Sequence, residues 1–341
     1  MRKYKVGLIG TGLQANRRLS SIAEHPLTTL ATIAGLNMDK ATHMAKLAGA
    51  KSCSCWKEVI QDDKIDIIVI CTPPDMHFPI AKVALKAKKH VLCEKPLTRS
   101  SSDALKLVSL ARKNKVVFKC GFNHRHHPAM QHVYQIVKDQ TLGYPITGRA
   151  VYGICGREDC TTEWRSDPKV ASGGQLMEQG IHAIDLFRWF IGDFDSVSAN
   201  VATLVFPIQP LEDTASVLLR KNNGVAVTIH SSITQWRNRF RFELYFSQGY
   251  IEIMGLGGSY DMQKLHIGKR DPNAPFAEQV IDYRGSDKSW RAEWKHFLEG
   301  IEQGTELLGS GIDGVEASRI VEAAYVSSKE ERFIKLKDFT L

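Results

Sequence analysis

The sequence lacks several patterns that mark whole classes of protein. It has no Cys-x-x-Cys pair, and its seven cysteines are an odd number, so neither a disulfide framework nor a zinc ribbon is indicated. It also has no run of five basic residues, although the net charge is +8. The charge is spread along the chain, which favours anionic small molecules over nucleic acid as partners. The cysteine pattern favours a reducing, cytoplasmic location.

Long hydrophobic runs are absent as well. The first apolar stretch, Val6 to Leu13, contains three glycines and is too short for a secretory core or a membrane span. We therefore expect no targeting segment and no membrane partner. A chain of 341 residues with 43% hydrophobic content suits two compact domains at about 150 residues each.

Strand-like and helical stretches alternate in the first third of the chain. Strands are predicted at Lys5–Gly10, Leu30–Leu36, Ile65–Cys71, His90–Cys93 and Val116–Gly121, and helices at Ala41–Leu47, Ile80–Lys88 and Asp103–Lys113. Alternation at this spacing argues for right-handed βαβ units around a parallel sheet. We therefore predict a doubly wound α/β domain over residues 1–122.

Beyond Pro128 the pattern changes to β-branched and aromatic runs separated by turns. Strands are predicted at Val197–Val205, Ala215–Leu219, Val225–Ser232, Arg239–Phe246 and Tyr250–Met254, with closing helices at Trp290–Gln303 and Val315–Lys329. Asn222-Asn223-Gly224 indicates a tight hairpin, because Asn and Gly tolerate a positive φ. We predict a second α/β domain over residues 123–341 with an antiparallel sheet, and we allow the final helix to pack back on the first domain.

A glycine-rich turn follows the first predicted strand. Gly10-Thr11-Gly12-Leu13-Gln14-Ala15 lies between that strand and a helix, where Gly10 allows the tight turn and Gly12 lets the backbone approach a pyrophosphate. The helix N-terminus then meets the phosphates. The context predicts a dinucleotide-binding turn, although glycines also serve such junctions for geometry alone.

The end of the second predicted strand decides which dinucleotide is expected. A carboxylate there would bind the ribose 2′-hydroxyl group of NAD, but the sequence reads Gly35-Leu36-Asn37. Asp39 comes later and equally fits a cap for the helix after it. Without an acid a 2′-phosphate is tolerated, and Asn37 or Lys40 could contact it. We expect NADP or NAD, with a preference for NADP.

Two further patterns place charged groups at expected ligand sites. Lys95, in Glu94-Lys95-Pro96, ends an apolar strand, and ligands bind beyond the carboxyl ends of parallel strands, although a solvated strand end is equally compatible. Glu178, His182 and Asp185 are spaced to share one helical face, which could line a cleft or be solvated. Gly173-Gly174 before them indicates a bend or a close backbone approach, which often accompanies a ligand.

In combination these patterns resemble the family of glucose-fructose oxidoreductase, inositol dehydrogenase and the rhizopine-catabolism oxidoreductases, almost from end to end. The matching motifs are Gly10-x-Gly12-x-x-Ala15, Cys71-Thr72-Pro73-Pro74 with His77, Glu94-Lys95-Pro96, Gly121-Phe122-Asn123-x-Arg125, Trp164-Arg165-x-Asp167-Pro168, Gly173-Gly174-x-Leu176-x-Glu178-x-Gly180-x-His182-x-x-Asp185, Glu212-Asp213-Thr214-Ala215 and Gly311-Ile312-Asp313-Gly314. The resemblance implies a Rossmann domain followed by an α/β domain whose large open sheet supports the active site and a homodimer or homotetramer interface.

The resemblance also implies roles for individual residues. Lys95 would contact the nicotinamide ribose and the reacting hydroxyl group, and His182 would be the acid or base. Cofactor contacts are implied at Thr72, Pro73, His77 and Glu94, and substrate contacts or support at Asn123, Arg165 and Asp185. Two positions depart from the family: Glu178 replaces a usual aspartate, and Gly35 stands where many members have an acid.

These roles define a reaction. NAD(P) would accept a hydride from a secondary alcohol of a sugar, polyol or sugar nucleotide. Histidine, with an ordinary pKa of about 6.5, can take the hydroxyl proton near neutral pH, with Glu178 or Asp185 orienting the ring. Lys95 would stabilise the developing alkoxide.

Two alternatives remain open. One is a non-catalytic NAD(P)-binding sensor or regulator of the same fold, against which the retained Lys95 and His182 argue. The other is a metal site on His124, His126 and His127 with Cys120. Successive residues of an extended segment point to opposite faces, so these ligands rarely converge on one ion. We expect no metal.

Overall fold

The computed structural model describes residues 3–340. They form two compact units. The first holds the residues up to Asn123 together with Ser289–Glu316, and the second holds His124–Lys288 and the residues from Ala317 onward. This confirms the fold expected from the sequence, in which a doubly wound parallel sheet is followed by a large, mostly antiparallel sheet.

The first unit is built on a six-stranded parallel sheet in the order β3-β2-β1-β4-β5-β6. Its strands are β1 (Tyr4–Ile9), β2 (Thr28–Ala34), β3 (Lys51–Cys53), β4 (Ile67–Ile70), β5 (His90–Cys93) and β6 (Phe118–Cys120). Because the order reverses beside β1, the carboxyl ends of β1 and β4 form the edge where such sheets bind ligands.

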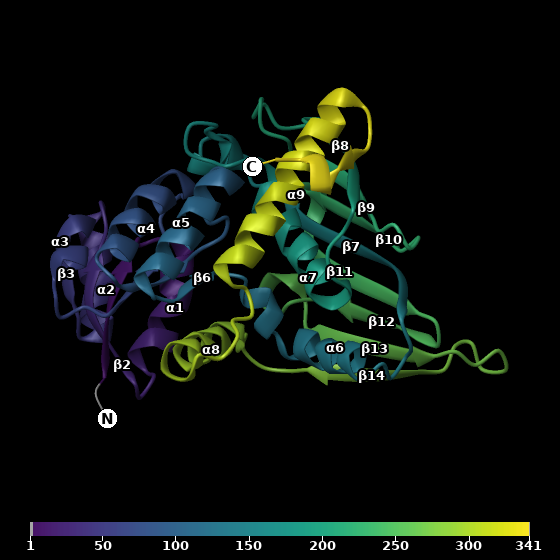
Figure 1. The fold of residues 1–341 in the computed structure, drawn as a ribbon, viewed down its shortest axis with the longest axis horizontal. Helices are drawn as coiled ribbons and strands as arrows, with labels where there is room; N and C mark the ends of the chain where they lie inside the picture. The colour runs from purple at the N-terminus through teal and green to yellow at the C-terminus, as the bar shows by residue number, and fades with distance from the viewer. Residues whose placement is uncertain (1–2, 341) are drawn as a thin grey trace. The chain divides into compact units, whose positions relative to one another are not determined.

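Helices cover both faces of this sheet (Figure 1). They are α1 (Leu13–Ala23), α2 (Met38–Ala48), α3 (Trp56–Gln61), α4 (His77–Lys86), α5 (Ser101–Asn114) and α8 (Ser289–Gln303). Although α8 comes late in the chain, its Trp294 and Phe297 are buried in one core with Val6, Leu8 and Ile22. The first unit is therefore completed by a segment that follows the second unit in sequence.

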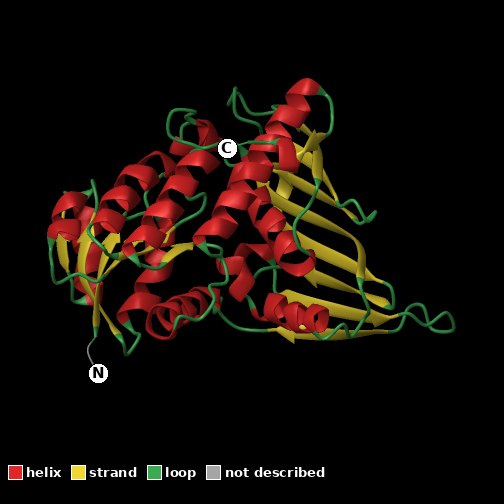
Figure 2. Cartoon of the chain, viewed as in Figure 1, coloured by secondary structure: helices red, strands yellow, loops and turns green. Residues whose placement is uncertain are grey.

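The second unit is built on a nine-stranded sheet in the order β14-β13-β12-β11-β7-β10-β9-β8-β15. Among the described residues only β7 and β10 pair in parallel. Figure 2 shows the strands of this large sheet in yellow. The strands are β7 (Pro145–Cys155), β8 (Ser196–Ala202), β9 (Thr214–Arg220), β10 (Ala226–Ser232), β11 (Thr234–Phe246), β12 (Gly249–Met254), β13 (Gln263–Lys269), β14 (Glu278–Tyr283) and β15 (Ile334–Lys335).

One face of this sheet is covered by helices. They include α6 (Pro128–Lys138) against β12 and β13, and α7 (Ile181–Ile191) against β7 and β10. The helix α9 (Gly311–Glu330) begins in the first unit and ends in the second. Phe187 of α7 packs on Phe242 of β11, with ring centroids 4.4 Å apart. This packing fixes α7, and with it His182 and Asp185, on the sheet.

The predicted strands and helices agree with the structure in kind, but several of them differ from it in where they begin or end. The hairpin at Asn222–Gly224 is confirmed, with Gly224 at φ +91° between the paired strands β9 and β10. The strand predicted over Val197–Val205 ends at Ala202 instead, because the backbone N–H groups of residues 204–206 donate to the Asp213 carboxylate. An acceptor beside the chain therefore ends the strand.

Candidate active site

The glycine-rich turn has the geometry that a dinucleotide needs. Gly10 has φ +112°, and a Cβ atom there would lie 2.5 Å from the Cys71 carbonyl oxygen. Gly12 caps α1 without a side-chain hydrogen bond, the first turn of α1 holds no acidic residue, and nothing described lies within 4 Å of a Cβ built on Gly12. The first N–H groups of α1 are therefore open to an anion, as phosphate sites at helix N-termini require.

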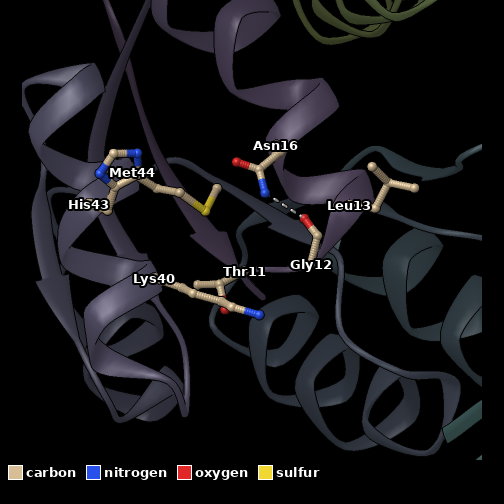
Figure 3. A pocket seen from close by; sticks show the side chains of 7 residues that line it. All are labelled: Thr11, Gly12, Leu13, Asn16, Lys40, His43 and Met44. Carbon is tan, nitrogen blue, oxygen red and sulfur yellow. Dashed lines mark hydrogen bonds between the residues drawn. The ribbon is translucent and has the colours of Figure 1, made fainter. Parts of the chain in front are cut away.

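A hollow of about 250 Å³ lies beside this turn (Figure 3). It is lined by Thr11, Gly12, Leu13, Asn16, Lys40, His43 and Met44, none of which is acidic. A Cβ atom on Gly35 would lie 2.4 Å from Thr11 Cγ2, so any side chain at position 35 would require Thr11 to move. Thr11 and Gly35 therefore fit each other sterically.

The start of α2 corrects one expectation. Asp39 does not cap this helix. Asn37 is the cap, and its Oδ1 accepts a hydrogen bond of 2.9 Å from the Lys40 N–H group, while Asp39 lies in the first turn. The helix begins earlier than predicted, so the cap position falls on Asn37. The oxygen of Asn37 is thus already engaged, which leaves the Lys40 ammonium as the stronger candidate of the two for a 2′-phosphate.

The segment after β4 contacts the loop that follows β5 and contains Lys95. The two ring nitrogens of His77 lie 2.8 Å from the Thr72 carbonyl oxygen and 2.7 Å from the Pro96 carbonyl oxygen. Burial lowers the pKa of His77. The Thr72 hydroxyl oxygen is buried and has no hydrogen-bond partner among residues 3–340. Buried polar atoms normally have a partner, so a bound ligand is a suitable one. Pro73 follows Thr72 and is partly buried.

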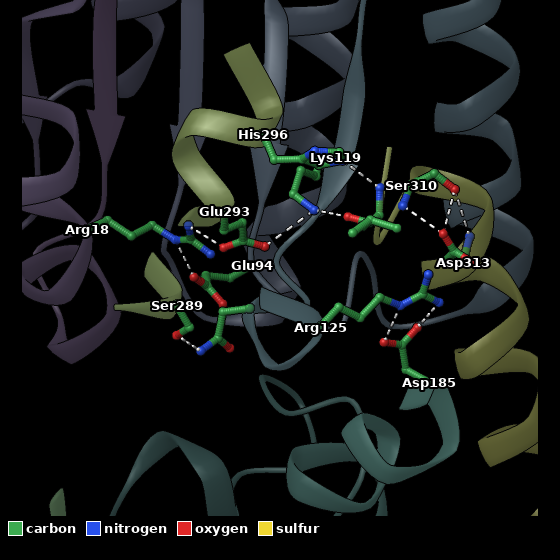
Figure 4. A network of polar contacts seen from close by, with 12 residues as sticks. Arg18, Glu94, Lys119, Arg125, Asp185, Ser289, Glu293, His296, Ser310 and Asp313 are labelled. Carbon is green, nitrogen blue, oxygen red and sulfur yellow. Dashed lines mark hydrogen bonds and ion pairs between the residues drawn. The ribbon is translucent and has the colours of Figure 1, made fainter. Parts of the chain in front are cut away.

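Glu94 is held by a buried ion-pair network (Figure 4). The Arg18 guanidinium donates to Glu94 Oε1 at 2.6 Å and to Glu293 Oε2 at 2.8 Å, and it lies 4.8 Å from the centre of the Trp290 ring. Burial lowers the pKa of Arg18, but the two carboxylates more than offset this and hold it above its ordinary value. Arg18 thus links α1, the helix that begins at the dinucleotide turn, to the residue before Lys95.

Gly121 and Asn123 complete this part of the first unit. A Cβ atom on Gly121 would lie 2.9 Å from Arg18 Nη2 and 3.0 Å from Glu94 Oε2, so the ion pair occupies the space a side chain would need. Asn123 donates from Nδ2 to the Ser289 hydroxyl at 2.9 Å, which ties the end of this segment to the start of α8. Lys95 itself is partly buried.

In the second unit, His182 and Asp185 lie on α7 and are both buried. The Arg125 guanidinium donates two hydrogen bonds, of 2.9 and 2.7 Å, to the two oxygens of Asp185 (Figure 4). Such a bidentate pair is strong and fixes the orientation of both groups. Asp185 therefore anchors α7 to the segment at Arg125.

Glu178 and Arg165 come together in the second unit. Arg165 Nε lies 3.4 Å from Glu178 Oε2, and its Nη1 donates to Glu163 Oε2 at 3.1 Å. The Arg165 side chain remains 37% exposed, and its guanidinium lies 4.3 Å from the centre of the Trp164 ring. Glu178 lies in a π-helical turn, Leu176–Gly180, that leads into α7. Such turns are frequent at functional sites.

The close approach predicted at Gly173-Gly174 is real, but protein atoms make it. A Cβ atom on Gly174 would lie 2.0 Å from the Glu212 carbonyl oxygen, and one on Gly173 would lie 2.3 Å from the Tyr325 hydroxyl. The Glu212 carboxylate accepts hydrogen bonds from the N–H groups of Gly174 and Leu176, at 3.0 and 2.9 Å. Glu212 therefore fills the space beside these glycines and holds the π turn in place.

The histidine-rich segment also has protein partners. The ring of His124 stacks on that of His182, with centroids 3.9 Å apart, and its Nε2 lies 3.1 Å from the Tyr152 hydroxyl oxygen. His127 Nδ1 lies 3.8 Å from Asp287. Within residues 3–340, no group of three or more His, Cys, Asp or Glu side chains is arranged to hold a metal ion.

No helix in the same range is long and apolar enough to cross a membrane.

Sequence reasoning missed the partners that fix the predicted site residues. Arg18, Glu293, Glu212, Tyr152 and the stacking role of His124 were not predicted. Of these, Glu212 stood in a matching motif, but nothing in it indicated a contact with Gly174. Arg17 and Arg18 are the two charged residues of α1, and only burial distinguishes Arg18 from its exposed neighbour.

Comparison with known proteins agrees with this geometry. Residues 4–122 match the model described as "Oxidoreductase family, NAD-binding Rossmann fold", and residues 130–252 match the "GFO/IDH/MocA C-terminal domain". The fold and the dinucleotide turn therefore define an oxidoreductase with an NAD-binding Rossmann domain. The chain belongs to the Gfo/Idh/MocA family, as its motifs predicted.

Two curated relatives match nearly the whole chain. A levoglucosan dehydrogenase of Pseudarthrobacter phenanthrenivorans is 24% identical, over 98% of this chain and 98% of its own length. A myo-inositol 2-dehydrogenase of Thermotoga maritima is 26% identical, over 98% of this chain and 99% of its own length. Both relatives are named as dehydrogenases, one of levoglucosan and one of myo-inositol.

Solved structures show the same fold. Levoglucosan dehydrogenase in complex with NADH and levoglucosan superposes with a TM-score of 0.88 at 22% identity, covering 98% of this chain and all of that one. An aldose-aldose oxidoreductase from Caulobacter crescentus complexed with glycerol gives a TM-score of 0.86 at 23% identity, with 98% and 100% coverage.

Proposed function

We propose that this protein transfers a hydride between NAD(P) and a secondary alcohol or ketone of a sugar, polyol or sugar nucleotide. The observation that carries the proposal is His182, a buried histidine held on α7 by a stacked ring and by the Arg125–Asp185 pair one turn further on. A general base must be held within hydrogen-bond reach of the proton it takes, and these contacts supply that restraint. The relatives' names support the substrate class.

In the oxidative direction, His182 takes the proton of the substrate hydroxyl group, and the Lys95 ammonium stabilises the negative charge that develops on the oxygen. The nicotinamide ring supplies the acceptor for the hydride. An ammonium group removed from bulk water stabilises an oxyanion more strongly than a hydrated one does. In the reverse direction His182 returns the proton to the ketone oxygen.

The remaining predicted residues bind rather than react. Gly10, Gly12, Leu13 and Gln14 would hold the pyrophosphate, with Thr72, Pro73, His77 and Glu94 toward the ribose. Arg165 and Glu178 would contact substrate hydroxyl groups, and Asn123 and Asp185 would support that region. Glu178 would also serve catalysis by orienting His182, as the sequence predicts. The hollow that contains Lys40 and His43 but no acid supports NADP over NAD.

We also propose that the protein forms a homodimer or homotetramer through the face of the nine-stranded sheet that the helices leave open. Cross-strand register places Arg241, Glu243 and Met254 on that face. Arg241 Nε lies 2.8 Å from Glu243, and Met254 is 42% exposed. Light scattering of the purified chain tests this, and a monomeric mass contradicts it.

The direct test of the function is a screen of cofactor reduction over sugars, polyols and sugar nucleotides, with NAD and NADP in parallel. We expect reduction with at least one polyhydroxylated ring. Binding of a dinucleotide without turnover of any substrate in either direction would instead indicate a non-catalytic sensor of the same fold.

A further inference from the structure

The ring of His124 packs directly on the ring of His182 and can restrict its orientation. The two rings are nearly parallel, at 20°, with centroids 3.9 Å apart, and both side chains are buried. His124 comes from the segment before α6, and His182 comes from α7, so the contact joins two separate elements. Its position in the sequence, in a cluster of histidines, gave no sign of this contact.

The ring of His124 is itself held in place. Its Nε2 lies 3.1 Å from the Tyr152 hydroxyl oxygen, on β7. The ring of Tyr152 packs edge-on against Phe240, at 5.2 Å and 86°, and against Tyr260, at 5.5 Å and 82°. A rigid strand and two further aromatic rings thus support the side chain that covers His182.

The geometry excludes two other roles for His124. The in-plane nitrogens of stacked imidazoles do not point at one another, so His124 is not placed to pass a proton to His182. Its Nε2 already faces the Tyr152 hydroxyl, which leaves that nitrogen unavailable as a second base. What the stack does is restrict rotation of the His182 ring about its last side-chain torsion, which is otherwise broad.

We propose that His124 is a positioning residue for His182: its ring, fixed by the Tyr152 hydroxyl group, holds the imidazole in the orientation from which it takes the substrate proton. This inference rests on the proposed function, because it assigns His182 the role of base. It adds a residue pair, His124 and Tyr152, that determines the rate of proton removal without touching the reacting atoms.

The test compares His124→Phe with His124→Leu. Both remove the imidazole nitrogens, but only Phe retains a flat ring that can stack. Misplacing a catalytic group by about 1 Å can cost about 100-fold in rate, so we expect Leu to lower kcat about 10- to 100-fold. His124→Phe keeps the stack but loses the contact with the Tyr152 hydroxyl group, so we expect it to lower kcat only about three- to tenfold, as Tyr152→Phe does. KM should change less than about twofold in both variants. Equal losses in the two variants, or a loss confined to KM, would overturn the proposal.

Two additional variants guard the comparison. Tyr152→Phe removes only the hydroxyl group and keeps the ring packing, so it should fold and lower kcat by about three- to tenfold, less than the loss expected for a misplaced base. An unchanged kcat in Tyr152→Phe would contradict the role of the hydroxyl group. His132→Leu is the matched control, because the His132 ring pairs with Tyr283 at 2.9 Å instead, and its kcat should equal that of the wild type.

A readout independent of turnover separates this inference from the proposed function. In the NMR spectrum, the His182 ring protons should carry a ring-current shift that His124→Phe retains and His124→Leu loses. If the wild type oxidises no substrate, the proposed function fails while the spectra still report whether the ring is held. If the His182 signals are the same in all variants, the positioning role is wrong even in an active enzyme.

Discussion

The guanidinium group of Arg18 donates a hydrogen bond of 2.6 Å to the carboxylate of Glu94, the residue directly before Lys95 (Figure 4). Arg18 also pairs with Glu293 of α8, which is fully buried. One side chain therefore connects α1, the loop that contains Lys95 and a helix from the far end of the sequence. The first unit depends on this connection.

Replacing Arg18 should destabilise the first unit strongly. Arg18→Met leaves the buried Glu94 carboxylate without its cation and leaves Glu293 with Lys119 alone, and breaking a buried pair in this way costs about 3–5 kcal/mol. Urea unfolding measures the change in the free energy of unfolding. Arg291→Met is the matched control, because Arg291 pairs with Glu24 at an exposed site, where such a pair contributes about 0–1 kcal/mol. Similar losses in the two variants would contradict the account.

Arg165 and Glu178 should act as a coupled pair on the substrate. We expect Arg165→Met and Glu178→Gln each to lower kcat/KM. The double variant should lose less transition-state stabilisation than the two single variants lose in sum, with a coupling free energy of about 0.5–3 kcal/mol, as for residues in contact. Steady-state kinetics of the four proteins gives this value. Arg332→Met provides the control cycle, because Arg332 pairs with Glu330 instead, and its effect should add to that of Glu178→Gln.

Lys40 should select NADP. A charge-assisted contact with the 2′-phosphate contributes about 1.5–3 kcal/mol, so Lys40→Ala should raise the Kd for NADPH about tenfold or more while leaving that for NADH unchanged. Fluorescence titration measures both constants. Lys46→Ala, near the other end of α2, serves as the control and should change neither. A wild-type protein that binds NADH at least tenfold more tightly than NADPH would refute the preference.

Glu212 should give stability a specific dependence on pH. Burial raises the pKa of its carboxyl group above the ordinary value of 4.5, despite lowering by the N–H groups of Leu176 and Gly174 and by the Tyr325 hydroxyl. The folded protein therefore binds more protons here than the unfolded chain does. This contribution is fully present below about pH 4.5 and is lost as the pH rises through the raised pKa.

Glu212→Gln removes that titration. The free energy of unfolding of the wild type, measured relative to this variant, should fall as the pH rises from about 4.5. Gln also places an N–H group toward the backbone donors of Gly174 and Leu176, at a cost of about 1–3 kcal/mol. Tyr325→Phe keeps the carboxyl group and should keep the pH dependence. If the difference in the free energy of unfolding between the wild type and Glu212→Gln is the same at every pH, the proposed role of Glu212 in the pH dependence is wrong.

Local sequence patterns predicted the parts of the fold that local forces determine. Gly10 and Gly224 have the positive φ that their turns require, and both positions were predicted from short segments. Alternating strands and helices predicted the parallel sheet, because right-handed crossovers leave few alternatives. Helix ends were less accurate, as at Asn37, where a cap two residues earlier than expected begins α2.

Contacts between distant segments could not be predicted. Arg18 and Glu293 are 275 residues apart in the sequence. Lys119 lies 3.5 Å from Glu293, and it belongs to a strand that was predicted only from its apolar residues. The stack of His124 on His182 likewise depends on how two segments, α7 and the residues before α6, pack on one sheet. A periodic pattern identifies which residues share a face, but it does not identify what covers that face.

The measurement that tests the central claim most directly is the rate of cofactor reduction by Lys95→Met and His182→Ala, each with its dinucleotide affinity measured in parallel. Loss of an acid–base group typically costs about 100- to 10,000-fold in rate. We predict that both variants lose turnover with the substrate that the wild type oxidises, and that His182→Ala still binds the dinucleotide. Near-normal turnover in either variant would contradict the account.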